Sequence, residues 1–509
     1  MMIRSSLLAI CFCLSIHAGD WATFGGNPQR TGWAKDEPKF TKDAVKNMKL
    51  LWSAKLDNAA KELNSLTVPV IVINKPTTKG FRDIVVVAGS SDKVFAMNAE
   101  DGKLVWQKTM SIEGTPKSAP HWLCPNALNA TPVIDRQTST VYVLASDGKL
   151  HAFNVINGED KMPPVQFVPA FAKTWSLNLH EGYLYTTISQ GCNGVRSSVY
   201  GMNLKDPSHP VTFFQSSPSG GAGIWGRAGA AITSGGKIVA ETGDGPYDEA
   251  AGKYSDTFLG LSVHDLKLID YYTPANRAWI TKKDLDMGNM SPIVFKFKNW
   301  ELVAGGGKEG VIYLLDAKSL GGTDHRTPLF RSPLYANEDI DFASRGFWGA
   351  MASYDDGKDT WLFAPAWGEQ TSVSPKFPVT HGPDKLGSIM AFKLAVKDNA
   401  PVLEPAWRSR ELGVPEAPVV ANGIVFAVSS GENTRQVSEG GDLYTSEHRA
   451  TTPIGNATLY AFDAQTGAEL FSSGKTMPGF THFSGLAVSE GRVYVVTHDS
   501  IVYAFGVPE

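Results

Sequence analysis

One stretch of the chain, residues 223–248, combines residue types that could do chemistry: GIWGRAGAAITSGGKIVAETGDGPYD. Trp225 stands between glycines near its start, and Asp244 stands in Thr-Gly-Asp-Gly-Pro near its end. An indole ring can carry a planar ligand, and a carboxylate oxygen is a ligand that Ca²⁺ accepts. The same residues also suit a short strand followed by a tight turn, because Asp before Gly-Pro stabilises turns. The stretch is therefore either a cofactor shelf that ends in a metal carboxylate or one part of a repeated sheet.

Composition narrows the class of protein to which these residues belong. The 509 residues are 42% hydrophobic and 10% aromatic, which is enough for a packed core. The 50 glycines and 30 prolines are spread along the chain, as expected for many short strands joined by turns. The formal net charge of −4, without a long basic run, argues against nucleic-acid binding.

The first 18 residues have the layout of a secretory signal peptide. One Arg precedes the apolar run Leu7 to Ile16, and the small residues Ala18 and Gly19 follow it. That run is too short to span a bilayer, which requires about 20 residues, and no later segment is as apolar over such a length. We therefore expect cleavage after Ala18 and a secreted or periplasmic protein that does not span the membrane. Residues 19–509 are expected to form a single domain.

Cleavage would leave two cysteines, Cys124 and Cys192. In an oxidising compartment these could form one disulfide, or they could be two separate buried thiols. The chain has no C-x-x-C-H motif and no zinc-type C-x-x-C spacing, so neither covalently attached haem nor a zinc site of that kind is expected.

Self-comparison reveals a repeated β unit, a strand that ends in a small residue, an apolar residue and a turn. It recurs eight times: VFAMNAEDGKLVW (94–106), LHAFNVINGED (150–160), VYGMNLKDPSHP (199–210), FLGLSVHDLKLID (258–270), IYLLDAKSLGG (312–322), IMAFKLAVKDN (389–399), LYAFDAQTGAELF (459–471) and VYAFG (502–506). Two further apolar strands precede each copy, and a more polar strand follows most of them.

This pattern predicts an all-β fold, an eight-bladed β-propeller of four-stranded antiparallel blades. Radial repetition leaves only short, protected sheet edges. The last repeat lacks a fourth strand, and the segment LLWSAKL (50–56) is a strand without a partner. We expect this N-terminal strand to complete the eighth blade and close the ring. A helical pattern occurs only near residues 41–49.

The repeat carries a family resemblance. The turn units NAEDGKLVW (98–106) and DAQTGAELF (463–471) resemble the docking repeat of propellers related to the pyrroloquinoline quinone (PQQ) dehydrogenases. The opening DWATFGGNPQRTGW (20–33) is similar to the start of that superfamily, and segments between residues 190 and 322 follow the order of its cofactor-binding half. The chain is identified as similar to quinoprotein alcohol dehydrogenases, nearest their polyvinyl-alcohol dehydrogenase branch. Eight blades agree with that family.

The resemblance implies a cofactor site. Trp225, in GAGIWG, matches the Trp on which the quinone stacks, and Lys308, in GGGKEGVIYLL, matches the Lys or Arg that contacts the cofactor. A cation there would polarise the reactive quinone carbonyl. The alternatives are a Trp packed between blades and a surface Lys in a strand turn.

The family's calcium ligands and catalytic base are matched only in part. Asp244 replaces an Asn ligand, but Cys192 stands where a Glu ligand is expected, and Cys prefers soft metals. Aligning the base-bearing segment on KKDLDMGNMSP places Asp284 and Asp286 on its two later acids and Thr281 at the base. The resemblance therefore implies PQQ, leaves Ca²⁺ in question, and makes Asp284 or Asp286 a substitute base.

Three functions are consistent with these features. The first is oxidation of a small alcohol or polyol by hydride transfer to PQQ, with a separate protein as electron acceptor and insertions near 323–347 and 368–387 as a lid. The second is a non-catalytic propeller that serves as an extracytoplasmic interaction or assembly scaffold. The third is a carbohydrate-handling propeller in which exposed aromatic residues in GFWGAM (346–351) and AWGEQ (366–370) stack on sugars.

Overall fold

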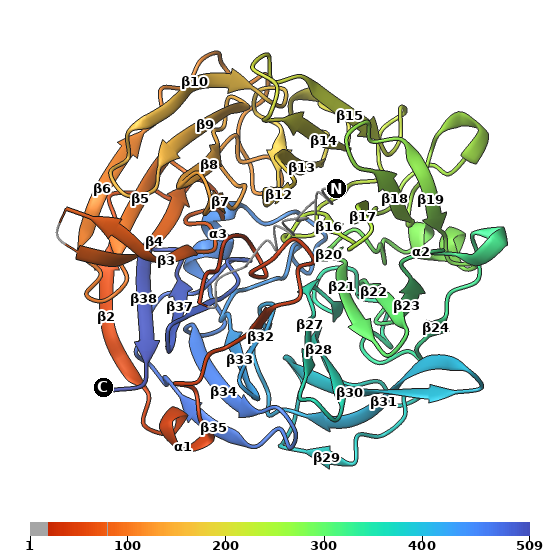
Figure 1. The fold of residues 1–509 in the computed structure, drawn as a ribbon. Coiled ribbons are helices and arrows are strands. Elements are labelled where there is room, and N and C mark those ends of the chain that lie inside the picture. Colours follow the sequence, from red (N-terminus) through yellow and green to blue (C-terminus); the bar gives the residue numbers. More distant parts are fainter. Residues whose placement is uncertain (1–18, 79, 509) are drawn as a thin grey trace, which may run out of the picture.

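A computed structural model describes residues 19–78 and 80–508, and they form an eight-bladed β-propeller (Figure 1). Eight small sheets are arranged radially around a central axis, and the chain runs outward within each blade before it returns to the axis. The predicted all-β class and blade number are confirmed. The predicted signal peptide, residues 1–18, lies outside the described residues.

The first four blades follow one another along the chain. Their strands, from the axis outward, are β3 (Val70–Thr77), β4 (Gly80–Gly89), β5 (Lys93–Asn98) and β6 (Leu104–Thr109); β7 (Val133–Asp135), β8 (Thr140–Leu144), β9 (Lys149–Asn154) and β10 (Asp160–Gln166); β11 (Lys173–Thr174) and β12 (Asn178–His180), β13 (Tyr183–Ser189), β14 (Ser198–Asn203) and β15 (Val211–Gln215); β16 (Ala231–Ile232), β17 (Lys237–Glu241), β18 (Phe258–Ser262) and β19 (Leu268–Tyr272).

The next four blades complete the ring. Their strands are β21 (Ile293–Phe297), β22 (Trp300–Gly306), β23 (Ile312–Asp316) and β24 (Phe330–Arg331); β25 (Gly346–Phe347) and β27 (Ala352–Asp355), β28 (Thr360–Trp367), β30 (Gly387–Lys397), β31 (Ala400–Arg408) and β29 (Val379–Thr380); β1 (Trp33–Ala34), β32 (Val419–Ala421), β33 (Ile424–Ser429), β34 (Thr458–Asp463) and β35 (Glu469–Ser472); β36 (Ala487–Ser489), β37 (Arg492–Val496), β38 (Ile501–Gly506) and β2 (Lys49–Lys55). A short parallel pair, β20 (Met290–Ser291) with β26 (Gly349–Ala350), links blades five and six.

The ring closes through β2, which pairs antiparallel with β38 as the fourth strand of blade eight. The N-terminal segment 50–56 was predicted to do this, and the prediction is confirmed. Because the first and last parts of the chain share one sheet, neither end of the ring is left as an open edge.

Neighbouring blades are joined by a recurring tryptophan contact. Trp52 lies against Gly102 of the next blade, and its indole N–H donates to the carbonyl of Ala99 at 3.0 Å. The same contact joins Trp106 to Gly158 and Trp407 to Gly467. Each glycine has a positive φ, and a Cβ there would lie within 2.9 Å of the indole ring, so glycine allows the close approach. The docking repeat seen in the sequence therefore connects one blade to the next.

The N-terminal arm, residues 19–34, lies near the axis at one end of the propeller. Its carbonyls accept backbone hydrogen bonds from the innermost strands of six blades, through Ile71, Ile134, Ile232, Val294, Ser353 and Val420. The arm also carries Arg30, which is fully buried and donates to Thr23 Oγ1 and to the carbonyls of Phe24, Leu177 and Ala230. Burial lowers the pKa of Arg30 to about 9. The arm thus ties the inner strands together.

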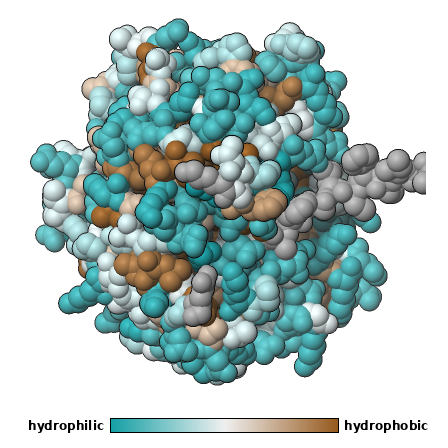
Figure 2. Space-filling view, turned by 60° about the vertical axis from the view of Figure 1, so that its left-hand side comes forward, coloured by the Kyte–Doolittle hydropathy of each residue, from teal (hydrophilic) through white to brown (hydrophobic). Residues whose placement is uncertain are grey.

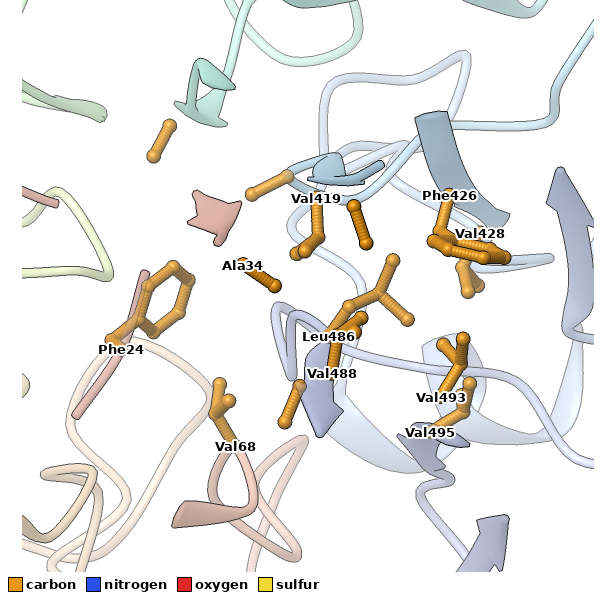
Figure 3. Close-up of a cluster of buried hydrophobic side chains, with 14 of the residues drawn as sticks. Phe24, Ala34, Val68, Val419, Phe426, Val428, Leu486, Val488, Val493 and Val495 are labelled. Carbon is orange, nitrogen blue, oxygen red and sulfur yellow. The ribbon is translucent and has the colours of Figure 1, made fainter. Parts of the chain in front are cut away.

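The core is formed between blades by apolar side chains of facing sheets. Figure 3 shows one such cluster, in which Phe24 and Ala34 of the arm lie near Val419, Leu486 and Val488 of blades seven and eight. On the face shown in Figure 2, hydrophilic residues predominate and hydrophobic residues form separate patches.

Within residues 19–78 and 80–508, three short α-helices interrupt the β fold: α1 (Lys42–Val45), α2 (Arg277–Lys282) and α3 (Ser446–Thr451). The first lies in the predicted helical segment 41–49, and Thr41 caps it by accepting from the N–H of Ala44. The described part of the chain contains no helix with the length and apolar character needed to cross a membrane. Helices α2 and α3 both contribute residues to the site described below, Thr281 and Arg449 respectively.

Candidate functional site

Five connecting segments lie side by side near the axis and carry the residues singled out from the sequence. They are joined by backbone hydrogen bonds from one blade to the next: Ala222 N to Asp244 O (2.6 Å), Gly243 N to Gly223 O (2.8 Å), Trp225 N to Gly288 O (3.2 Å), Lys308 N to Asp286 O (3.1 Å) and Phe347 N to Gly307 O (3.0 Å). These bonds fix the relative positions of Trp225, Asp244, Asp286 and Lys308, although 83 positions separate the first from the last.

Glycines allow the segments to approach so closely. A Cβ on Gly288 would lie 2.4 Å from both Gly223 O and Gly243 N. A Cβ on Gly243 would lie 2.5 Å from Asp286 Oδ2 and 2.9 Å from Trp225 Nε1. The carboxylate of Asp286 and the edge of the Trp225 indole therefore share the space next to Gly243.

Lys308 is the centre of the cluster. Its Nζ lies 2.5 Å from Asp286 Oδ1 and 2.9 Å from Asp284 Oδ1. It also lies 5.0 Å from the ring centroid of Trp225, within the range of a cation–π contact. The Lys308 side chain is 3% exposed, so it is not the surface lysine that was the alternative interpretation of GGGKEG.

The three carboxylates predicted as ligand or base come together. One oxygen each from Asp244, Asp284 and Asp286 lies within 4.8 Å of the other two. Burial raises the pKa of Asp286 to about 7, with Lys308 acting against the shift and Asp284 and Asp244 adding to it. Burial alone would lower the pKa of Lys308, but Asp286 and Asp284 outweigh it and the pKa is raised. With all three carboxylates ionised, the ammonium of Lys308 leaves a net charge of −2, which a divalent cation would balance.

Asp256 joins this cluster and was not singled out from the sequence. It is fully buried and accepts hydrogen bonds from Thr281 Oγ1 and from the N–H of Met287. Burial, and then the charge of Asp286, raise the pKa of Asp256 well above its usual range. Thr281, aligned with the family's base, thus contacts a carboxyl group that belongs to another segment. The only local signal was an Asp placed directly before an apolar strand, in YSDTFLG.

Trp225 is half-buried, and its ring meets that of Trp348 edge to face, with centroids 6.2 Å apart. Trp348 in turn stacks on Trp367, with centroids 4.4 Å apart and an interplanar angle of 9°. Both of these tryptophans are almost fully buried, with exposed fractions of 4% and 3%. The prediction that GFWGAM and AWGEQ present exposed aromatics for sugar stacking is therefore wrong, because these rings pack against each other.

Two basic side chains, the half-buried Arg227 and the buried Lys173, form another wall of the same chamber. The guanidinium of Arg227 lies between the rings of Trp175 and Phe483, at 4.2 and 3.8 Å from their centroids. Lys173 Nζ donates to the carbonyl of Trp122 at 3.4 Å and lies 5.3 Å from the Trp175 ring. Burial lowers the pKa of Arg227 to about 9 and that of Lys173 well below its usual range. Among the described residues, neither cation forms an ion pair, so the wall favours an anionic group.

Arg449 of α3 also lines the chamber. It is 4% exposed, lies 2.8 Å from Glu432 Oε1 and has its guanidinium 4.8 Å from the ring of Trp122. The chamber enclosed between Arg449 and Trp225 has a volume of about 40 Å³. A second hollow of about 650 Å³ lies on the other side of Trp122, lined by Glu62, Tyr444 and Glu447 among others. Ala343, from one of the two insertions predicted as a lid, lines the chamber, but α3 was not predicted there.

Cys124 and Cys192 are joined by a disulfide. The bond connects the segment that carries Trp122 and Leu123, both of which line the chamber, to the loop between β13 and β14 of blade three. Cys192 is thus occupied by a covalent bond at the position where the family resemblance expects a calcium ligand.

Comparison with known proteins agrees with this architecture. Residues 34–191 match the PQQ_2 family model, described as outer membrane protein assembly factor BamB. This part of the chain therefore matches the repeats of that family, within the eight-bladed propeller. No curated protein sequence matches it.

Among solved structures, the propeller is similar to quinoprotein dehydrogenases. A europium-containing methanol dehydrogenase superimposes with a TM-score of 0.65 at 12% identity, covering 96% of this chain and 98% of the other. Quinohemoprotein alcohol dehydrogenases from Pseudomonas putida and Comamonas testosteroni have TM-scores of 0.61 and 0.56 at 13% and 15% identity. Each covers 96% of this chain, which in turn covers 80% and 82% of theirs. At such identities the likeness is one of fold.

Proposed function

We propose that this PQQ-repeat propeller is an exported quinoprotein-type oxidoreductase that oxidises a small alcohol or polyol. The observation that carries the proposal is the convergence, in one axial site, of Trp225, Lys308 and the carboxylates of Asp244, Asp284 and Asp286. A flat aromatic surface beside a buried cation and clustered acids is the combination that the chemistry requires.

The residues present fit the chemistry of PQQ, a planar tricarboxylate. Trp225 would stack against the rings, and Lys173 and Arg227, which lack carboxylate partners among the described residues, would bind its carboxylates. The chamber of about 40 Å³ is small beside the roughly 300–1,000 Å³ of ordinary ligand sites, so binding requires Arg449 and its neighbours to move. Asp244, Asp284 and Asp286 would hold Ca²⁺ through oxygen ligands, in competition with Lys308.

PQQ, when bound, supplies a carbonyl carbon that accepts hydride from the alcohol carbon. The chain's own part is to remove the hydroxyl proton and to stabilise negative charge. Asp286 is the better placed base, because it lies at the edge of the Trp225 ring and its pKa of about 7 suits proton transfer near neutral pH. Asp284 holds the ammonium of Lys308 in place, and Lys308 stabilises charge on a neighbouring oxygen.

Export and a separate electron acceptor belong to the same proposal. A disulfide between Cys124 and Cys192 is the bonding expected in an oxidising compartment, in line with the signal peptide inferred from residues 1–18. Without covalent haem, electrons would pass from the reduced cofactor to another protein.

A direct experiment uses the purified protein, PQQ and Ca²⁺. We expect saturable quenching of tryptophan fluorescence and dye-linked oxidation of at least one member of a panel of alcohols and polyols. Trp225→Ala should abolish most of the quenching, whereas Trp279→Ala, at an exposed position on α2, should behave like the parent. Absence of both quenching and dye reduction would overturn the oxidoreductase proposal. Quenching that survives in Trp225→Ala would overturn the site while leaving the activity.

A second candidate is a non-catalytic scaffold for assembly of other proteins. The family model that matches residues 34–191 is described as an assembly factor, and Cys192 replaces an expected ligand. A chain that binds neither PQQ nor Ca²⁺ but retains a folded propeller would favour this role.

A further inference from the structure

A large hollow lies at the end of the propeller opposite the candidate active site. Strand β17 runs from one end of the propeller to the other. Ser234, which lines the hollow, lies just before the start of this strand, and Asp244 of the candidate site lies just after its end. The hollow has a volume of about 800 Å³, within the range of small-molecule sites. Neither the proposed oxidation nor its cofactor uses this space.

The walls of the hollow are held in place before any ligand binds. The N-terminal arm forms much of one wall, and its carbonyls accept hydrogen bonds from Val294 (2.9 Å) and Ser353 (2.9 Å), which form the wall opposite. A site built on such cross-linked backbone loses little conformational entropy when it is occupied.

Two aromatic rings lie at right angles in the hollow. Trp33 and Tyr354 have centroids 5.5 Å apart and an interplanar angle of 88°, and both side chains are half-exposed. The ammonium of Lys35 lies 4.5 Å from the Trp33 centroid, but Lys35 is an exposed side chain that can move aside. The two rings therefore form an aromatic platform inside a hollow whose lining mixes polar and apolar residues.

Most of the carboxylates of the hollow already accept hydrogen bonds within the chain. Asp20 accepts from Arg136, Glu37 from the N–H groups of Glu490 and Gly491, Glu301 from the N–H of Ser234, and Asp355 from the N–H of Gly357. Asp36 and two lysines, Lys35 and Lys296, complete the charged part of the lining. Backbone hydrogen bonds do not neutralise a carboxylate, so the hollow keeps a net negative charge.

Neutral hydrogen-bonding groups, by contrast, are available. The side-chain amide of Gln29 has no hydrogen-bond partner among the described residues, and it can both donate and accept. The indole N–H of Trp21, a wall residue that is 1% exposed, also lacks an acceptor there. A buried donor without an acceptor is unfavourable, so a ligand oxygen at this wall would be stabilising.

We propose that this hollow binds a neutral oligosaccharide, with Trp33 and Tyr354 as its stacking platform. A sugar ring has an apolar C–H face and a rim of hydroxyl groups that donate and accept. The C–H face matches the aromatic platform, and the hydroxyls match Gln29, Trp21 and the oxygens of Glu301 and Asp355. The proposal does not rest on the oxidoreductase function, because the two sites lie at opposite ends of the propeller.

Isothermal titration of the purified protein with oligosaccharides of glucose, xylose and N-acetylglucosamine tests it. We expect at least one of these to bind saturably. Trp33→Ala and Tyr354→Ala should each weaken that binding at least tenfold, and Trp33→Phe should retain part of it. Spermidine, a small organic cation, should not compete.

Two control variants make the result specific. Trp279→Ala removes an exposed tryptophan outside the hollow and should leave binding unchanged. Trp225→Ala should also leave it unchanged, which separates this site from a polyol bound as substrate. The proposal is overturned if none of the three sugar series binds, or if binding is retained in both platform variants. Loss of binding in Trp225→Ala would overturn it as well.

Discussion

Lys308 and Asp286 form a buried ion pair in which Nζ lies 2.5 Å from Oδ1, and neither side chain is more than 3% exposed. The pair lies beside the Trp225 ring, with Asp284 as a second, half-exposed partner of the ammonium. Removing water from two charges is costly, so each charge depends on the other. This dependence predicts that the free energy of unfolding changes, in a pH-dependent way, when one partner of the pair is replaced.

Replacing Lys308 with Met should strongly destabilise the propeller above neutral pH. The substitution leaves the buried Asp286 carboxylate without its cation, and breaking such a pair costs about 3–5 kcal/mol. The loss should be smaller at pH 5, because Asp286, with a pKa of about 7, is then protonated. Urea denaturation at pH 8 and pH 5 measures both values.

Two controls accompany this variant. Lys318→Met, at an exposed position of the same blade, should change stability by less than about 0.5 kcal/mol. Combining Lys308→Met with Asp286→Asn should recover part of the lost stability. An equal loss at both pH values would contradict a charge-based explanation.

Gly243→Ala should displace both the Trp225 ring and the Asp286 carboxylate. The added Cβ would lie 2.5 Å from Asp286 Oδ2 and 2.9 Å from Trp225 Nε1, distances that force one or both groups to move. We expect a stability loss of about 1–3 kcal/mol and at least tenfold weaker quenching by PQQ. Gly235→Ala is the matched control, because the nearest atom to its Cβ is 4.0 Å away. Unchanged quenching in Gly243→Ala would mean that PQQ binding does not depend on the close contact of Gly243 with Asp286 and Trp225.

The blades and the ring closure could be predicted because their signals repeat. A strand pattern seen eight times specifies a propeller more strongly than any one copy does, and the segment 50–56 had no other strand to pair with. Trp225, Lys308 and the three aspartates could be singled out because they lie in an ordered match to one family. The structure places them within one cluster.

Residues outside that match could not be found in the same way. Asp256, Lys173 and Arg449 reach the site from three blades, and no local spacing connects them. Trp348 and Trp367 were interpreted as exposed, but they stack on each other in the wall of the chamber. A tryptophan in a turn sequence carries no signal of its burial, because burial depends on which blades surround it.

Removing the disulfide should lower the stability of the folded protein, because the unfolded chain gains conformational entropy without the cross-link. Cys124 and Cys192 are 68 positions apart, and opening a loop of that size corresponds to about 4 kcal/mol in the chain-entropy account. We expect Cys124→Ser/Cys192→Ser to show an earlier urea midpoint. The parent protein under reducing conditions, with free thiols verified by mass spectrometry, should shift similarly. A midpoint that stays in place in both cases would contradict a stabilising role.

Glu416→Gln should change how stability depends on pH. Glu416 is buried, accepts hydrogen bonds from Thr481 Oγ1 (2.9 Å) and the N–H of Ser484 (3.3 Å), and burial raises its pKa from 4.5 to about 7. Between these two values the folded protein holds a proton that the unfolded chain has released. This group therefore contributes progressively less to stability as the pH rises from about 4.5 to 7.

Gln is similar in size, keeps an acceptor oxygen and does not titrate in this range. Relative to the parent, Glu416→Gln should gain up to about 3 kcal/mol of stability between pH 4.5 and pH 8. Urea denaturation at half-unit pH intervals measures the difference between the two proteins, which cancels the contributions of other groups. Glu411→Gln, at a half-exposed position, should show no such trend. Parallel pH profiles for parent and Glu416→Gln would mean that the carboxyl is already ionised in the folded protein near pH 5.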